Sequence, residues 1–90
     1  MVRYPTIRID VSSTVPAYTQ IENAIRVCLV EGELRPGMRL PPVRQLAVNL
    51  GVHHNTVAEA YRRLAREGWL ELRRQRGAIV RQRAPGVAPK

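Results

Sequence analysis

Residues 43–64, VRQLAVNLGVHHNTVAEAYRRL, contain two helical patterns separated by a glycine. In the first half, apolar residues recur at three- and four-residue steps, which predicts a helix of about two turns that Gly51 ends in the left-handed conformation. A longer helix is predicted to begin at His54. Its apolar face consists of Val57, Ala60, Tyr61 and Leu64. The stretch therefore predicts two short helices joined by a tight turn, which is the helix-turn-helix pattern.

Two further elements are predicted to complete one small domain. Upstream, Pro16 suits the first turn of a helix that runs from about residue 16 to about residue 31, and Gly32 is its expected stop. Downstream, residues 69–72 and 78–80 are predicted to form two short strands, bridged by a basic tip at residues 73–77. The predicted fold class is mainly α with a small β-hairpin: a winged helix-turn-helix of three helices and a two-stranded wing.

The two ends of the chain are interpreted as accessory segments. Polar and apolar residues alternate at residues 8–11, which allows one short strand within an N-terminal arm of residues 1–14. The winged helix domain is assigned to residues 15–82. Residues 83–90 contain Pro, Gly and Ala and are predicted to be a flexible tail or the start of a linker.

The charge of the chain is large and unevenly distributed. Fifteen basic residues against seven acidic ones give a formal net charge of +8. Residues 1–40 hold five Arg and four acidic residues (+1), whereas residues 41–90 hold nine Arg, one Lys and three Glu (+7). Such an excess favours polyanionic partners through counterion release. The alternative is a charge that only confers solubility, but solvated surfaces usually mix both signs more evenly.

Catalytic and metal-binding patterns are missing from the sequence. Ninety residues form at most one small domain, which leaves little room for a deep enzyme pocket. The adjacent His53 and His54 would point about 100° apart on a helix, and no Cys, Asp or Glu joins them at ligand spacing. There is no carboxylate pair, Cys/His arrangement or phosphate loop. We therefore expect neither an enzyme nor a bound metal or cofactor.

Cysteine usage and hydropathy indicate the compartment. Cys28 is the single cysteine and falls among apolar residues at helical spacing, so we expect a reduced, buried and inert thiol. A reactive sensor cysteine is the alternative. No apolar run is long enough for a signal peptide or a membrane span. These features predict a soluble, cytoplasmic protein without a membrane partner.

The helix-turn-helix pattern predicts where a nucleic acid would be contacted. In such folds the first turn of the second helix of the pair enters the major groove. That turn carries His53, His54, Asn55 and Thr56. The hairpin that follows would bring its arginine-rich loop near the adjacent minor groove or the phosphate backbone. Three like charges at one hairpin tip repel each other, and a phosphate partner would relieve that repulsion.

Several ordered pieces of the sequence resemble the GntR-type winged helix-turn-helix transcription factors, in particular the subgroups with a short or aminotransferase-like C-terminal part. The resemblance covers roughly residues 15–80. Its main pieces are Gly32-Glu33-Leu34-Arg35-Pro36-Gly37, Leu40-Pro41, Arg44-Gln45-Leu46-Ala47, Leu50-Gly51-Val52, Asn55-Thr56-Val57 and Glu67-Gly68-Trp69-Leu70. It implies operator binding as a dimer, one recognition helix per half-site, usually for repression. It also implies that Arg44 reaches a guanine edge or a phosphate and that Gly77 is the wing glycine.

The sequence departs from the family pattern at positions that matter for binding. Pro42 replaces a serine that would cap the helix predicted to begin near residue 43. His53-His54 stands where Ser-Arg is common, so a permanently charged fork is replaced by a group that is charged only when protonated. Gln75 replaces a first wing glycine, and Ile79 a phenylalanine. These departures predict an operator that differs from a family consensus.

The predicted partner is double-stranded DNA, bound by a homodimer on a palindromic operator. The predicted DNA-contacting residues are Arg44, His53, His54, Asn55, Thr56, Arg62, Arg73, Arg74, Gln75, Arg76 and Gly77. A winged helix that binds RNA or another protein is the alternative function. No effector pocket is expected within these residues. If the chain dimerises unaided, its N-terminal segment and first helix must supply the interface.

Alternatives remain open for individual side chains. His53 could be an incidental, solvated residue at the helix start. Arg62, Arg63 and Arg66 fit a solvated face paired with Glu59 and Glu67 as well as they fit a backbone contact. Finally, Tyr18, Tyr61 and Trp69 fall on the apolar pattern, which favours a place in the core over a base-stacking role.

Overall fold

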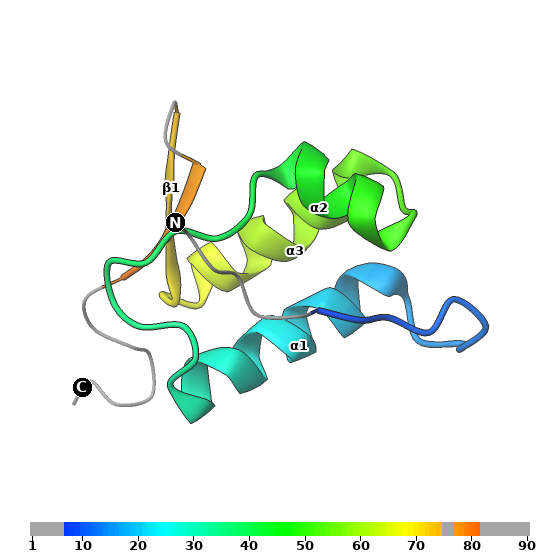
Figure 1. Ribbon diagram of the computed structural model, residues 1–90, viewed down its shortest axis with the longest axis horizontal. Helices are drawn as coiled ribbons and strands as arrows, with labels where there is room; N and C mark the ends of the chain where they lie inside the picture. The colour runs from blue at the N-terminus through cyan, green and yellow to red at the C-terminus, as the bar shows by residue number, and fades with distance from the viewer. Residues whose placement is uncertain (1–6, 75–76, 82–90) are drawn as a thin grey trace.

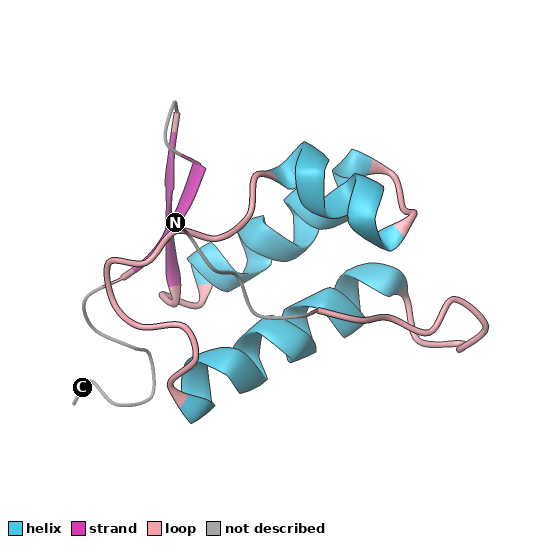
Figure 2. Ribbon diagram, in the orientation of Figure 1, coloured by secondary structure: helices cyan, strands magenta, loops and turns pink. Residues whose placement is uncertain are grey.

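The computed structural model describes residues 7–74 and 77–81, and the structural statements below concern these residues. Three helices precede a β-hairpin, as Figures 1 and 2 show. The elements are α1 (Ala17–Glu31), α2 (Val43–Leu50), α3 (His54–Arg66), β1 (Leu70–Arg73) and β2 (Gly77–Val80). The predicted winged helix-turn-helix is confirmed.

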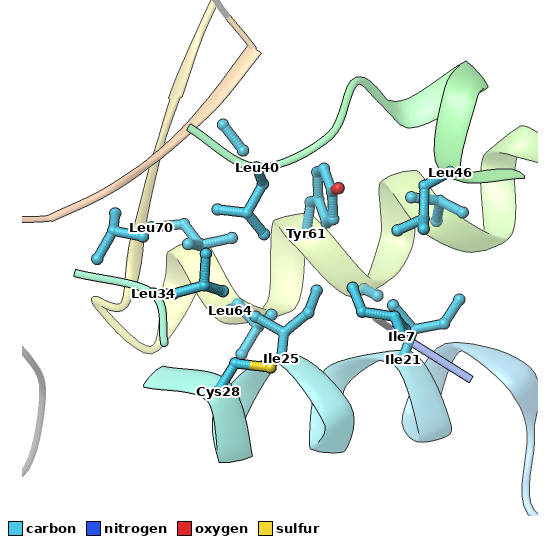
Figure 3. Close-up of a cluster of buried hydrophobic side chains, with 14 of the residues drawn as sticks. Ile7, Ile21, Ile25, Cys28, Leu34, Leu40, Leu46, Tyr61, Leu64 and Leu70 are labelled. Atoms are coloured by element: carbon cyan, nitrogen blue, oxygen red, sulfur yellow. The ribbon is translucent and has the colours of Figure 1, made fainter. Parts of the chain in front are cut away.

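The core lies where α1, α2 and the hairpin meet on α3. Figure 3 shows the buried apolar side chains between these elements, with Ile25 from α1 close to Leu64 from α3 and Ile21 from α1 close to Ile7. The fully buried side chains include Ile21, Ile25, Val57, Leu64 and Leu70. Full burial of a side chain of this size contributes about 1.5–3 kcal/mol relative to exposure. The apolar periodicity of the sequence thus fixes which face of α3 points inward and which is left for the solvent.

The expected aromatic core residues and the cysteine lie as predicted. Tyr61 is buried, and Tyr18 and Trp69 are half-buried against the core. Cys28 is a free, buried thiol. Burial, aided by a hydrogen bond to Glu33, raises the pKa of the Cys28 thiol to about 11, so at neutral pH it stays protonated and a poor nucleophile.

The predicted N-terminal strand is wrong. Residues 7–10 are extended but belong to no strand. Instead the side-chain amide of Gln20 on α1 pairs with the backbone of Asp10: the Asp10 N–H donates to Gln20 Oε1 (2.6 Å), and Gln20 Nε2 donates to the Asp10 carbonyl (3.0 Å). A glutamine thereby supplies the two hydrogen bonds that a neighbouring strand would give. Ile7 is buried and Ile9 partly buried against the core, whereas Val11 is exposed.

The turn between α2 and α3 has the geometry that its glycine predicts. Gly51 has φ +73°, and its N–H donates to the Ala47 carbonyl at 2.9 Å. The N–H of Val52 donates to the same carbonyl at 3.0 Å. At the start of α2, Pro42 offers no capping side chain, in agreement with the departure noted in the sequence. The glycine is therefore the residue that sets the angle between the two helices.

The hairpin differs from its predicted bounds. Antiparallel pairing joins Leu70 to Val80 and Arg73 to Gly77, so Arg73 and Gly77 lie in the strands rather than in the tip. The predicted tip residues Gln75 and Arg76 lie outside the described residues. Trp69 precedes β1 because its N–H donates to the carbonyl of Leu64 at 3.0 Å.

The segment at residues 38–40 pairs with β2 on the hairpin. Arg39 and Ile79 form an antiparallel bridge. Around it, the Val80 N–H donates to the Met38 carbonyl at 2.8 Å, and the Leu40 N–H donates to the Ala78 carbonyl at 2.9 Å. The sequence did not predict this pairing. The pairing anchors the base of the wing to the loop that leads into α2.

Within the part of the chain that the structure describes, no helix combines the length and apolar character required to cross a membrane.

Candidate nucleic-acid interface

The start of α3 is capped by a histidine. His53 is the N-cap residue, and its Nδ1 accepts a hydrogen bond from the Asn55 N–H at 3.0 Å. An imidazole nitrogen accepts only when it carries no proton, so the neutral ring holds its proton on Nε2. His53 is exposed. It therefore has a structural role that a merely solvated residue would lack, and it also presents an N–H donor to the outside.

His54 lies against His53 and beside an arginine. The two imidazole rings are stacked, with centroids 4.3 Å apart and planes inclined at 29°. Burial of the half-exposed His54 lowers its pKa below the ordinary 6.5, and the charge of Arg44 and the neighbouring His53 lower it further. His54 is therefore uncharged at neutral pH, where it can donate one hydrogen bond and accept another.

A groove brings these side chains together at the junction of α2 and α3. Its volume is about 250 Å³, and its lining consists of Arg44, Ala47, Val48, Val52, His53 and His54. Three of the predicted contact residues, from two helices, thus share one concave surface. Asn55 is exposed and Thr56 half-buried on the first turn of α3, next to this groove along the chain.

A second groove lies between α3 and the wing. Its volume is about 200 Å³, and it is lined by Val43, Ala58, Tyr61, Arg62, Leu72, Arg73, Gly77 and Ala78. Three more predicted contact residues, Arg62, Arg73 and Gly77, meet there. Six of the eleven predicted contact residues therefore line one of the two grooves. Asn55, Thr56 and Arg74 line neither, and Gln75 and Arg76 lie outside the described residues.

The arginines of the predicted site differ in their pairing. Arg62 donates to Glu59 at 2.9 Å, and Arg73 donates to Glu71 at 3.3 Å. By contrast, Arg44 and Arg74 are exposed and have no ion-pair partner among residues 7–74 and 77–81. Among the predicted contact residues that the structure describes, Arg44 and Arg74 can therefore bind phosphate without first breaking an ion pair.

The remaining arginines of α3 are engaged within the protein. Glu59 is within 3.6 Å of Arg63 and 3.9 Å of Arg66, and hydrogen bonding to Arg62 is the main cause that lowers the Glu59 pKa. The expected partner Glu67 pairs instead with Arg26 of α1 at 2.8 Å. Helical spacing could show Glu59 as a partner, but a contact with another helix has no local signal.

Three residues of the groove at the α2–α3 junction are absent from the predicted contacts: Ala47, Val48 and Val52. Val48 follows Arg44 by four residues and must share its helix face. That spacing is the signal that could have identified it. In the described part of the chain, no group of three or more His, Cys, Asp or Glu side chains is placed to hold a metal ion.

The comparisons with known proteins identify the family. Residues 17–80 match the family described as "Bacterial regulatory proteins, gntR family". The chain belongs to the GntR family. One GntR-type relative, the HTH-type transcriptional repressor YtrA of Bacillus subtilis, is 40% identical over 78 residues, which make up 87% of this chain and 60% of that protein. The chain spans about three fifths of the length of the first curated relatives that it matches.

Solved structures share the GntR-family fold. YtrA from Sulfolobus acidocaldarius, a GntR-family transcription factor, has a TM-score of 0.79 at 40% identity, with coverage of 87% of this chain and 82% of that one. AraR(DBD) in complex with operator ORX1 has a TM-score of 0.74 at 21% identity, with coverage of 88% and 99%. At that identity the second likeness concerns the fold alone.

Proposed function

We propose that this chain is a sequence-specific DNA-binding domain that regulates transcription by placing the start of α3 in the major groove of an operator. The observation that carries the proposal is the groove at the α2–α3 junction, where Arg44 lies beside His53 and His54 and no carboxylate is present. The names of the relatives support it, since YtrA of Bacillus subtilis is a transcriptional repressor and AraR(DBD) was solved with an operator.

The groove offers complementary donors to DNA. Arg44 provides a permanently charged fork that suits the O6 and N7 atoms of guanine or a phosphate. His53, with Nδ1 engaged in the cap, directs an Nε2–H donor outward. Neutral His54 contributes a second hydrogen-bonding edge. Asn55 on the same turn suits an adenine edge or a phosphate.

The wing completes the proposed interface on the other side of α3. Arg74 follows the end of β1 and has no ion-pair partner among the described residues. Arg73 and Arg62 line the second groove, and their carboxylate partners are exposed enough to be exchanged for phosphate. We assign this side to the sugar-phosphate backbone or the adjacent minor groove.

We further propose that the chain binds DNA as a homodimer. A homodimer places one α3 in each half of a two-fold operator, with half-site centres about 34 Å apart or a multiple of that distance. Binding in the cytoplasm then acts on transcription by repression, without any catalytic step.

Selection of sites from random duplex DNA, followed by gel-shift titration at about 0.1 M salt, tests the proposal. We expect one enriched sequence with two related half-sites. Arg44→Ala should weaken binding to it by about 1–3 kcal/mol. Arg8→Ala is the matched control, because Arg8 is exposed on the N-terminal segment away from the groove and should change affinity little. Failure to retain any duplex, or preference for RNA of equal length, would overturn the proposal.

A further inference from the structure

Val48 is an exposed apolar residue on the face that carries Arg44. It leaves 79% of its surface exposed, whereas Val43, Leu50 and Val52 pack against the core. Its side chain thus contributes little to the packing of α2. Single exposed apolar residues are common on protein surfaces, and Val30 of α1 is another. Val48 differs from Val30 in its place, because it lines the groove that also holds Arg44, His53 and His54.

The surroundings of Val48 form a groove with two kinds of wall. Ala47, Val48 and Val52 supply apolar surface, and Arg44, His53 and His54 supply the polar edge. The stack of His53 on His54, with ring centroids 4.3 Å apart, keeps the imidazole wall in place. An occupant must therefore present an apolar group directly beside hydrogen-bond acceptors.

In the major groove of DNA, thymine is the base whose edge presents an apolar group beside a hydrogen-bond acceptor. The 5-methyl group of thymine is the apolar feature that a major-groove surface reads, and it lies beside the O4 acceptor. A neighbouring guanine would offer acceptors to Arg44. The sugar-phosphate backbone would satisfy the arginine alone but leave the valine methyl groups without a matching surface.

We infer that the groove at the α2–α3 junction seats the 5-methyl group of an operator thymine, with Val48 as the specificity-determining contact beside Arg44. This inference rests on the proposed DNA-binding function. It assigns to α2 a part in base recognition, in addition to the start of α3. It also predicts that a thymine stands next to the base that Arg44 contacts.

Deoxyuridine substitution tests the inference, because uracil lacks only the methyl group of thymine. In the duplex enriched by selection, each thymine of one half-site is replaced singly by uracil. We expect one position to weaken binding by about fourfold, which corresponds to loss of one buried methyl group. Val48→Ala should weaken binding to the thymine duplex by a similar factor and leave binding to the uracil duplex at that position unchanged.

The controls separate this inference from the proposed function. Val30→Ala is the matched variant, because Val30 is 71% exposed on α1, and it should leave the thymine-to-uracil ratio as in the parent chain. Equal weakening of both duplexes by Val48→Ala would mean that the valine contacts the backbone, and would overturn the inference. So would a half-site at which no thymine responds. In both cases the duplex is still bound, so the proposed function stands; loss of all duplex binding would overturn both.

Discussion

Arg63 of α3 forms an ion pair with Glu22 of α1, whose side chain is only 8% exposed. The carboxylate of Glu22 is the main cause that raises the pKa of Arg63, and Arg26 lies 3.8 Å from the other oxygen of Glu22. The guanidinium of Arg63 also lies 5.0 Å from the ring centroid of Tyr18. The second half of α3 is therefore fixed to α1, while its first turn stays exposed for a ligand.

Breaking this pair should destabilise the fold. Arg63→Met leaves Glu22 buried with Arg26 as a more distant partner, and we expect a lower free energy of unfolding, by an amount that the partial exposure of Arg63 limits. Glu22→Gln should cost less because no buried charge remains. The double variant should lose less than the sum of the two. Urea unfolding measures all three, and strictly additive losses would contradict a direct coupling.

Tyr61 holds the loop before α2 onto α3. Its hydroxyl donates to the buried carbonyl of Pro41 at 2.7 Å, and the residue is only 2% exposed. Tyr61→Phe leaves that carbonyl without this donor, so we expect a loss of about 1–2 kcal/mol in thermal or urea unfolding. Tyr18→Phe is the control, because Tyr18 is only half-buried and the change keeps the ring next to Arg63. Equal effects of the two changes would contradict the assigned role of the Pro41 carbonyl.

The sequence predicted the features of this fold that depend on local pattern. Helical spacing gave the core face of α3, and Gly51 gave the left-handed turn, because both are set within a few residues along the chain. The pairing of Arg39 with Ile79 and of Glu67 with Arg26 joins segments that are 40 or more residues apart, and such contacts leave no periodic signal. The same limit produced the false strand at residues 8–11, where Gln20 takes the place of a neighbouring strand.

The candidate site was predicted in its composition more than in its arrangement. The family resemblance pointed to Arg44, and the helix-turn-helix pattern pointed to the first turn of α3. Of these residues Arg44, His53 and His54 meet in one groove, whereas Asn55 and Thr56 do not line it. The capping bond of His53 could not be foreseen, since an imidazole is an uncommon cap. Helical spacing allowed the pairing of Arg62 with Glu59, but whether it forms depends on side-chain conformation.

Neutralising Glu59 should strengthen binding to DNA. Its carboxylate pairs with Arg62 and lies near Arg66, so Glu59→Gln frees cations and removes one repulsive charge from the α3 surface. We expect tighter binding to non-specific duplex and a steeper dependence of log K on log salt, by up to about one phosphate contact. Glu31→Gln is the charge-matched control, because Glu31 is exposed at the end of α1. Equal gains from both variants would indicate a general charge effect without release of Arg62.

Acidification should act in opposite directions on stability and on DNA binding. The pKa of His54 is lowered in the folded chain from its ordinary 6.5, chiefly by burial and next by Arg44. Between the two values the unfolded chain binds more protons, so stability is fully present above about pH 6.5 and falls as the pH drops through the folded pKa. The lowered pKa of Glu59 keeps that carboxylate ionised over the same range. Phosphate near His54 would favour the imidazolium form, so DNA affinity should rise as the pH falls.

Urea unfolding and gel-shift titration between about pH 8 and pH 5.5 measure the two effects. His54→Gln should flatten both, because glutamine keeps a hydrogen-bonding side chain that does not titrate. His53→Asn is the matched control, because asparagine also caps a helix and the change leaves His54 in place. If the pH dependence of stability survives in His54→Gln, the assigned role of His54 is wrong.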